Sequence, residues 1–287
     1  MEKLYPVGIQ NFEEIIKGNY SYVDKTELVY KLVSTGKYYF LSRPRRFGKS
    51  LLISTLEAYF LGKKELFKGL AMENLEKEWI EYPILHLDLN TKKYNNNNSI
   101  ENILNQHLEI WEDLYGNEKK DRSPEERFTY IIRKAYEKTG RNVVILIDEY
   151  DKPMLQAIGN EKLLNDYRDT LKAFYGTLKS CDKYIKFALL TGVTKFSKVS
   201  VFSDLNNLMD ISIDSRYANI CGITEKELYT YFKDDINILA EKNGINEDEA
   251  KKELKEWYDG YHFVKDGDDI YNPVSYTHLT LPTTERV

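Results

Sequence analysis

Four short apolar runs alternate with helical segments along this chain, and that alternation limits the possible folds more than any other feature. The runs cover residues 38–41, 83–89, 143–147 and 185–191. Short, continuous apolar runs of this kind are typical of strands that are buried on both faces. Strands that alternate with helices predict an α/β fold, with a parallel sheet flanked by helices. Ligands of such folds bind at the carboxyl ends of the strands, so residues that follow each run are candidates for a functional site.

Capping residues mark the helix boundaries. Asn11 and Asp24 each stand three residues before a glutamate, and Ser123 adds a proline in the first helical position. Helix ends are predicted at four glycines, where a left-handed residue is favoured: Gly18, Gly36, Gly62 and Gly140. Helices are therefore expected on both sides of each strand.

The character of the chain changes near residue 221. Thr224 and Glu227 form a capping box that predicts one helix ending near Gly244, and a second helix is expected over about residues 246–258. We therefore expect a large domain over residues 1–220 and a small helical appendage over 221–274.

The last residues, 275–287 (SYTHLTLPTTERV), lack the charged, tyrosine-rich character of the rest. They resemble a translated vector read-through, so we leave them out of the fold prediction and expect the natural protein to continue past Pro273.

Composition excludes several classes of protein. With 42% hydrophobic residues in 287, the chain can bury a sizeable core, and its net charge of −5 argues against a surface built throughout for phosphate backbones. Cys181 and Cys221 are far apart, which indicates buried thiols and neither a disulfide framework nor a zinc ribbon. No signal peptide and no apolar stretch of membrane-spanning length is apparent, so we expect a cytoplasmic protein with no membrane partner.

The run at 38–41 leads into a phosphate-binding pattern. Gly48 leaves room for a phosphate, and the helix predicted over 51–61 adds about half a positive charge at its N-terminus. Lys49 is expected to reach the β- and γ-phosphates, and the Ser50 hydroxyl to bind Mg²⁺. The predicted nucleotide-binding residues are Arg45, Arg46, Phe47, Gly48, Lys49, Ser50 and Leu51.

The general pattern, G-x-x-x-x-G-K-[ST], has a glycine where this chain has Arg43. Pro44, Arg45 and Arg46 make the loop stiffer and more basic, and their guanidinium groups are candidates for contacts with phosphates or a partner. A chance Gly-Lys-Ser in a solvated basic turn would have the same sequence, so the rest of the chain must decide.

Two acids supply the second half of the pattern. Asp148 and Glu149 follow the apolar run 143–147, which is the Walker B arrangement. Asp148 is predicted to hold Mg²⁺, directly or through water, and Glu149 to orient and deprotonate the attacking water. Because adjacent strand residues point in opposite directions, the two are expected to differ in role. An acidic turn after a core strand is the alternative. Asp151 and Lys152 are interpreted as a solvated loop with a local ion pair.

Thr191 ends the fourth run and is predicted to present its hydroxyl to the γ-phosphate or attacking water, which makes it a catalytic candidate beside Lys49 and Glu149. A polar residue at a strand end can also serve as a cap only. Arg216 could reach a nucleotide in cis or from a neighbouring subunit, although a surface salt bridge is the simpler use of a lone arginine.

Seven segments together carry a family resemblance: 22–26 (YVDKT), 43–50 (RPRRFGKS), 147–151 (IDEYD), 190–193 (LTGV), 221–225 (CGITE), 258–261 (YDGY) and 271–273 (YNP). Over about residues 5–274 the chain resembles AAA-ATPase-like proteins, which often carry a C-terminal PD-(D/E)XK nuclease-like domain. In that family Arg43 belongs to the usual form of the phosphate loop. The resemblance implies a P-loop NTPase core, Mg²⁺ dependence and a helical or winged-helix region after the core. It also implies that the nuclease-like domain would begin after about residue 280, so we assign no nuclease activity to this chain and expect that nucleic acid could be a partner through that domain.

The leading hypothesis is Mg²⁺-dependent ATP binding and hydrolysis, coupled to a conformational change or to DNA-directed machinery, in a chain that can form a homo-oligomer. The alternative is a slow switch that exchanges closed and open states around bound ATP or ADP. Two further hypotheses are a scaffold with a vestigial pocket and a nucleic-acid binder that uses Arg43, Arg45 and Arg46.

Overall fold

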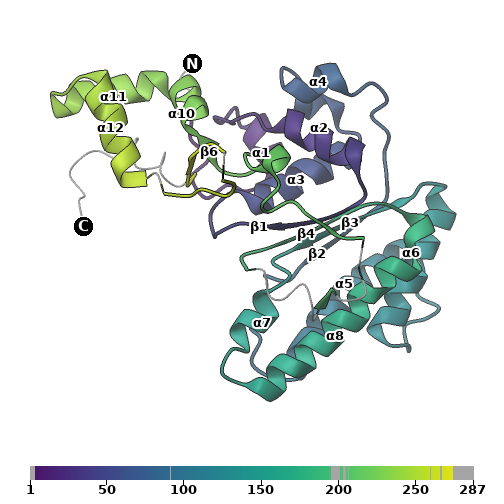
Figure 1. The fold of residues 1–287 in the computed structure, drawn as a ribbon. Helices are drawn as coiled ribbons and strands as arrows, with labels where there is room; N and C mark the ends of the chain where they lie inside the picture. Colours follow the sequence, from purple (N-terminus) through teal and green to yellow (C-terminus); the bar gives the residue numbers. More distant parts are fainter. Residues whose placement is uncertain are drawn as a thin grey trace.

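A five-stranded parallel sheet forms the centre of the molecule (Figure 1). The computed structural model describes residues 4–90, 92–194, 201–202, 205, 207–258, 260–265 and 267–273. The strands are β1 (Tyr38–Ser42), β2 (Ile84–Asp88), β3 (Val143–Asp148), β4 (Ile185–Gly192) and β5 (Met209–Asp210), in the spatial order β2-β3-β4-β1-β5. The predicted α/β fold is therefore confirmed, and each of the four apolar runs is a strand. The two-residue edge strand β5 lies outside those runs.

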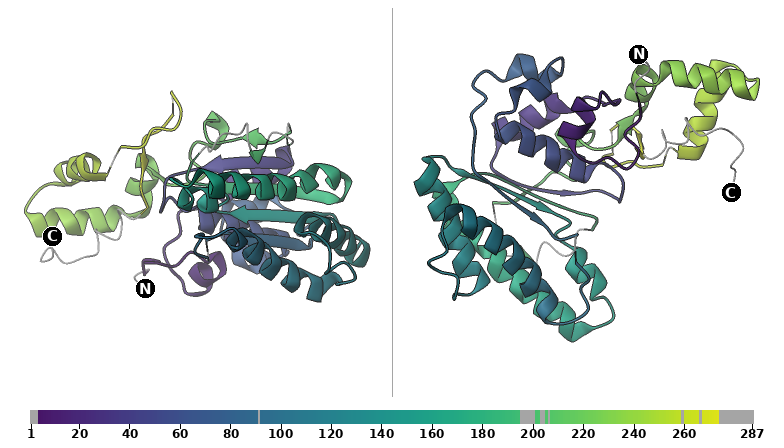
Figure 2. Two further views of the ribbon diagram at one scale, coloured as in Figure 1. Left: turned by 90° about the horizontal axis from the view of Figure 1, so that it is seen from below. Right: turned by 180° about the vertical axis from the view of Figure 1, so that it is seen from behind.

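Helices cover both faces of the sheet (Figures 1 and 2). One face carries α1 (Phe12–Lys17), α2 (Thr26–Thr35), α3 (Lys49–Phe60) and α4 (Ala71–Leu75), with the 3-10 turn η1 (Lys64–Phe67). The other carries α5 (Asn98–Tyr115), α6 (Pro124–Thr139), α7 (Lys152–Gln156) and α8 (Glu161–Ser180), with the turn η2 (Asp182–Tyr184) before β4. Successive side chains of a strand alternate between these two layers: Tyr38 and Phe40 pack with α5, α6 and α8, while Tyr39 and Leu41 pack with α1, α2 and α3. This double burial explains why β1, β3 and β4 are largely apolar, whereas buried and partly exposed residues alternate in the edge strand β2.

The predicted caps form, with one shift. The Asn11 side chain accepts from the Glu14 N–H, and Ser123 forms a capping box with Pro124 at the first position of α6. Asp24 is not the N-cap residue, because α2 begins at Thr26 and Lys25 holds the N-cap position. The Asp24 carboxylate still accepts from the first helical residue, from the Thr26 N–H at 2.8 Å and the Thr26 hydroxyl at 2.7 Å.

Two of the four helix-ending glycines have a different reason for their identity. Gly62 (φ 66°) and Gly140 (φ 64°) are left-handed as predicted. Gly18 (φ −79°) and Gly36 (φ −162°) are not, so that part of the prediction is wrong. Space is the constraint instead, since a Cβ at Gly36 would lie 2.3 Å from the Tyr39 hydroxyl.

The C-terminal part of the described chain forms a small unit beside the N-terminal segment (Figure 1). It contains an antiparallel pair of β6 (Ile223–Thr224) and β7 (Ile270–Tyr271), and the helices α10 (Glu225–Tyr231), α11 (Lys233–Asn243) and α12 (Glu247–Tyr258). The turn η3 (Ser215–Tyr217) precedes this unit, and its Tyr217 packs in the core of the sheet domain. Its own apolar cluster includes Ile223, Leu228, Phe232, Ile236 and Tyr271.

The predicted single helix from Thr224 to Gly244 is two helices. Its start and end are confirmed by the Thr224 capping box and by left-handed Gly244, but the helix is interrupted at Phe232, whose φ is −122°. The Phe232 side chain is buried in the small core, so packing overrides helical continuity there. The second predicted helix matches α12, whereas residues 275–287 lie outside the described part.

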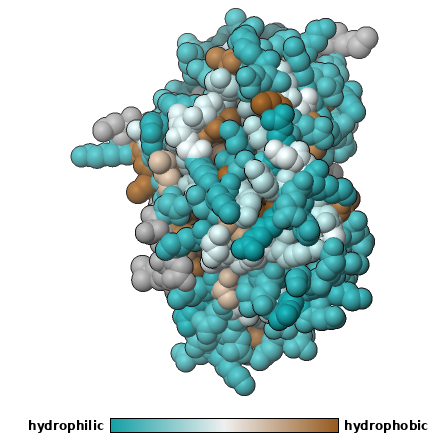
Figure 3. Space-filling view, turned by 90° about the vertical axis from the view of Figure 1, so that its right-hand side faces the viewer, coloured by the Kyte–Doolittle hydropathy of each residue, from teal (hydrophilic) through white to brown (hydrophobic). Residues whose placement is uncertain are grey.

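Exposed apolar side chains are scattered. The face in Figure 3 is mostly hydrophilic, with apolar residues in small separate patches. Cys181 and Cys221 are both buried and unpaired, as predicted. Within the residues that the structure describes, no helix has the length and apolar character needed to cross a membrane.

Candidate functional site

The strand order brings the predicted site residues together. Because β4 lies between β1 and β3, its last residues pair with the ends of both, with Thr191 opposite Leu41 and Leu190 opposite Ile147. The loop after β1 therefore meets the acids after β3, with Thr191 between them.

The phosphate-loop segment turns sharply before α3. Gly48 has φ 88° and precedes the first helical residue, Lys49, while Arg46 also has a positive φ of 66°. Arg45 and Arg46 are exposed. Phe47 is fully buried, with its ring 4.6 Å from that of Tyr261 and 5.6 Å from that of Phe263, so its side chain anchors the loop to the C-terminal unit.

Arg43 has a different place from the other two arginines. Its guanidinium donates to the carbonyls of Ser212 (2.8 Å) and Ala218 (3.1 Å) and stacks on Phe263 at 4.0 Å. The residue is 1% exposed, and burial lowers the pKa of its side chain. The hypothesis that Arg43 shares a basic surface with Arg45 and Arg46 is therefore wrong. Arg43 is buried, and its hydrogen bonds join the end of β1 to the segment 212–218.

Lys49 and Glu149 form an ion pair inside the site. The Lys49 Nζ lies 3.2 Å from Glu149 Oε1 and donates to the carbonyl oxygens of Arg43 (3.2 Å) and Pro44 (3.3 Å). Only 3% of the Lys49 side chain and 17% of the Glu149 side chain are exposed. Burial raises the pKa of Glu149, and the nearby Lys49 charge opposes that rise.

Glu149 lies beyond the strand, in the left-handed region. β3 ends at Asp148, and Glu149 has φ 55°. The strand-alternation argument therefore does not apply to this pair, because Glu149 is outside the strand. The two acids nevertheless have different partners: Glu149 contacts Lys49, and Asp148 contacts Ser50 and Thr191.

Ser50, Asp148 and Thr191 form a connected set of oxygens. The Ser50 hydroxyl donates to Asp148 Oδ2 at 2.6 Å, and the Thr191 hydroxyl donates to Asp148 Oδ1 at 2.5 Å. Thr191 is fully buried and faces Asp148. The Asp148 carboxylate and the Ser50 hydroxyl are hard oxygen ligands, the kind that Mg²⁺ prefers. This ion takes few protein ligands and keeps several waters, so two adjacent oxygen groups fit it.

Asp151 and Lys152 do not form the solvated ion pair that was expected. Asp151 is completely buried, and its Oδ2 accepts from the N–H groups of Val193 and Thr194 and from the Thr194 hydroxyl. Lys152 donates to the carbonyl oxygen and to the side chain of Asn90. Sequence reasoning missed Asp151, and the only signal for it was its place in the IDEYD segment.

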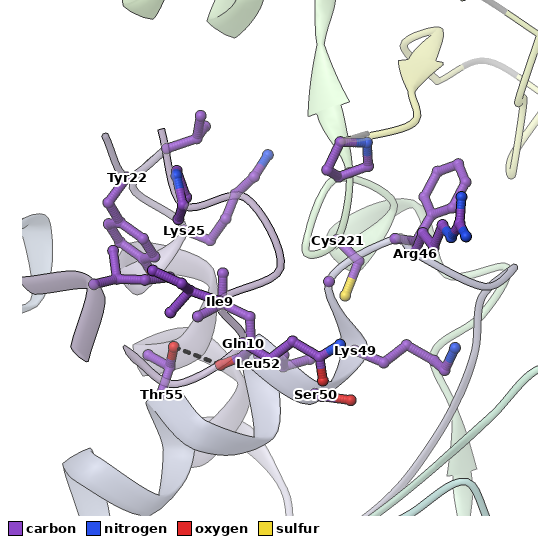
Figure 4. A pocket seen from close by; sticks show the side chains of 18 of the residues that line it. Ile9, Gln10, Tyr22, Lys25, Arg46, Lys49, Ser50, Leu52, Thr55 and Cys221 are labelled. Atoms are coloured by element: carbon purple, nitrogen blue, oxygen red, sulfur yellow. Dashed lines mark hydrogen bonds between the residues drawn. The ribbon is translucent and has the colours of Figure 1, made fainter. Parts of the chain in front are cut away.

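A cavity of about 560 Å³ extends from the phosphate loop to the N-terminal segment. Figure 4 shows Lys49 and Ser50 at one end and Tyr22 and Lys25 at the other. All seven predicted nucleotide-binding residues line it, as do Glu149 and Cys221. Its volume is in the range of pockets for small ligands.

Arg216 is not among the residues that line this cavity. Its guanidinium pairs with Asp214 at 2.6 Å, and about half of its side chain is exposed. The simpler interpretation, a surface salt bridge, is therefore the observed one.

A parallel sheet, a left-handed glycine before α3 and two acids at the carboxyl end of β3 define a P-loop NTPase fold. The family model for predicted AAA-ATPases matches residues 6–202, and the chain belongs to this AAA-ATPase-like family. The family supports nucleotide binding and hydrolysis in general.

One relative, from Azotobacter chroococcum mcd 1, bears the description "Uncharacterized protein in vnfD 5'region". It is 40% identical over 272 residues, which cover 94% of this chain and 50% of the relative. The chain therefore spans about half the length of that protein. No solved structure matches the chain.

Proposed function

We propose that this chain binds Mg-ATP at the phosphate loop and hydrolyses it to ADP and phosphate. The observation that carries the proposal is a pair of contacts at the phosphate loop: Lys49 Nζ lies 3.2 Å from Glu149 Oε1, and the hydroxyl of the next residue, Ser50, donates to Asp148 Oδ2 at 2.6 Å. Lys49, Ser50 and Glu149 line one end of the cavity. A cation, a hydroxyl and two carboxylates with separate partners are the groups that phosphoryl transfer requires.

Each residue is assigned one role. Backbone N–H groups around Gly48 and the Lys49 ammonium bind the β- and γ-phosphates, and Ser50 and Asp148 hold Mg²⁺, which neutralises phosphate charge when bound. Glu149 accepts a proton from the water whose oxygen attacks the γ-phosphorus, and the bond to the β–γ bridging oxygen breaks, which leaves ADP. Thr191 fixes the Asp148 carboxylate in this scheme.

The opposite end of the cavity is suited to the nucleoside. Tyr22 and Lys25 lie at that end, and Ile9, Gln10 and Leu52 line the cavity between it and Ser50 (Figure 4). A flat purine base favours such a lining. Coupling to DNA-directed machinery, homo-oligomerisation and a cytoplasmic location remain proposals that derive from the sequence.

A slow nucleotide-dependent switch is the second candidate, and the Lys49–Glu149 ion pair favours it. In this pair the Lys49 ammonium, which is proposed to bind phosphate, contacts the Glu149 carboxylate, which is proposed to be the base. If the pair persists beside bound ATP, Glu149 cannot accept a proton, and turnover is slow.

The test compares the wild type with Lys49→Ala and Glu149→Gln, and measures binding of a fluorescent ATP analogue and phosphate release with and without Mg²⁺. Lys49→Ala is expected to lose binding, and Glu149→Gln to bind but hydrolyse about 10²–10⁴-fold more slowly. Lys68→Ala and Glu65→Gln change exposed residues outside the cavity and serve as matched controls. Equal, slow turnover in the wild type and Glu149→Gln would favour the switch, and a wild type that neither binds nor hydrolyses would refute both.

A further inference from the structure

Asp151 is a buried carboxylate that the proposed chemistry does not use. It is 0% exposed, and its Oδ2 accepts from Val193 N (3.0 Å), Thr194 N (2.7 Å) and the Thr194 hydroxyl (2.7 Å). Its Oδ1 has no hydrogen-bond partner in the part of the chain that the structure describes. A charged group buried with one oxygen unsatisfied costs free energy, so its retention needs a reason beyond packing.

The contacts of Asp151 join the turn after β3 to the turn after β4. In the same joint, the Tyr150 N–H donates to the Thr191 carbonyl at 2.9 Å, and the Tyr150 hydroxyl donates to the Thr194 carbonyl at 2.9 Å. Gly192 packs closely against both side chains: a Cβ at this position would be 2.7 Å from Asp151 Oδ1 and 2.5 Å from the Tyr150 ring. The carboxylate thus fixes Val193 and Thr194, and the space beside it admits only a glycine at position 192.

The proposed base, Glu149, and Thr191, which fixes the Asp148 carboxylate, are both next to this joint. Thr191, whose hydroxyl donates to Asp148, stands two residues before Val193, the first residue that Asp151 binds. Glu149 stands two residues before Asp151 with a φ of 55°, a backbone conformation that costs free energy for a residue with a side chain and persists only where its surroundings impose it. The Lys152 N–H closes this turn onto the Glu149 carbonyl at 3.0 Å.

We infer that Asp151 is a positioning residue for hydrolysis: it locks the turn after β3 against the turn after β4 and so sets the places of Glu149 and Thr191. The inference rests on the proposed ATPase function. Since Asp151 does not line the cavity, its loss should affect the chemical step and leave nucleotide affinity unchanged.

The experiment measures Kd for Mg-ATP, single-turnover kcat and Tm for Asp151→Ala, Asp151→Asn and Thr194→Val. Asp151→Ala is expected to lower kcat about 10–100-fold at unchanged Kd, the effect typical of residues that orient a catalytic shell. Asp151→Asn keeps an oxygen acceptor for the same donors, so it should restore most of that loss. Thr194→Val removes one donor at a partly exposed position and should lower kcat less, again at unchanged Kd.

Glu112→Gln is the matched control for a merely structural effect, because Glu112 is a buried carboxylate that pairs with Arg127 far from the site in sequence. It should lower Tm without lowering kcat. If Asp151→Ala does not fold, Asp151→Asn and Thr194→Val decide the matter through the ratio of their kcat values to that of the wild type.

Wild-type kcat in both Asp151→Ala and Thr194→Val, or a parallel fall of kcat, Kd and Tm that Glu112→Gln reproduces, would overturn the inference alone. A wild type that releases no phosphate would overturn the proposed function and this inference with it, so the two failures are distinguishable.

Discussion

At the scale of single residues, neighbours of the same type in one loop have different environments. Arg43 is buried against two carbonyls and the Phe263 ring, whereas Arg45, two residues later, is exposed. A sequence pattern does not distinguish the two arginines, because the carbonyl and aromatic partners of Arg43 come from residues 212–263, which only folding brings close to it. The same limit explains the error at Asp151, whose donors are more than 40 residues away.

Replacement of Arg43 should therefore cost far more stability than replacement of Arg45. Arg43→Ala leaves buried carbonyls without donors and removes a stacked side chain, so we expect a loss of about 2–4 kcal/mol in the free energy of unfolding. Arg45→Ala, its matched control, should change that free energy by at most about 0.5 kcal/mol. Urea unfolding of both variants measures the difference. Equal losses in the free energy of unfolding would contradict the assignment of a structural role to Arg43.

At the scale of elements, much of the fold follows from the sequence. Strands β1, β3 and β4 are predictable because burial on both faces requires apolar runs, and the edge strand β2 is predictable from its alternating buried leucines. The caps at Asn11, Ser123 and Thr224 are predictable because they act locally. Strands β5, β6 and β7 have two residues each, too few for any period to be read. The interruption at Phe232 depends on a core that local sequence does not contain.

Glu13, in the first turn of the short helix α1, forms two ion pairs that give a pH-dependent prediction. Glu13 pairs with Lys17 on α1 and with Lys63 after α3, each at 2.5 Å, and these partners lower the pKa of Glu13 from 4.5 to about 2. A carboxyl whose pKa is lower in the folded state stabilises the protein above its unfolded pKa and loses that effect as pH falls through its folded pKa.

Glu13→Gln should accordingly lower Tm slightly at pH 7, with the difference from the wild type shrinking as pH falls from about 4.5 to about 2. Thermal unfolding across this range measures it. Glu14→Gln, at an exposed neighbouring position, is the control and should show no such convergence. A Tm difference for Glu13→Gln that stays constant down to pH 2 would rule out the ion pair as its cause.

At the scale of the whole molecule, the N-terminal segment joins the sheet domain to the C-terminal helices. Lys25 donates to both carboxylate oxygens of Glu227 at 2.6 Å, and the Asp24 N–H donates to the Tyr231 hydroxyl at 3.3 Å. Tyr5 stacks on Phe232 with ring centroids 5.8 Å apart. Because Lys25 also lines the cavity, this joint lies at the wall of the proposed nucleotide site.

Breaking the Lys25–Glu227 pair should loosen the C-terminal helices selectively. Their side chains are 10% and 22% exposed, so Lys25→Met leaves a largely buried carboxylate unpaired, and we expect a loss of about 2–3 kcal/mol, below the about 3–5 kcal/mol typical of fully buried pairs. Amide exchange of α10 should accelerate while that of β3 and β4 does not.

The double variant Lys25→Met/Glu227→Gln keeps the capping box on Thr224 and removes the unpaired charge, so it should recover part of the loss. Lys251→Met, which breaks the more exposed pair with Glu247, should cost at most about 1 kcal/mol. Equal costs for the Lys25 and Lys251 variants, or no recovery in the double variant, would show that the ion pair does not hold these helices to the sheet domain.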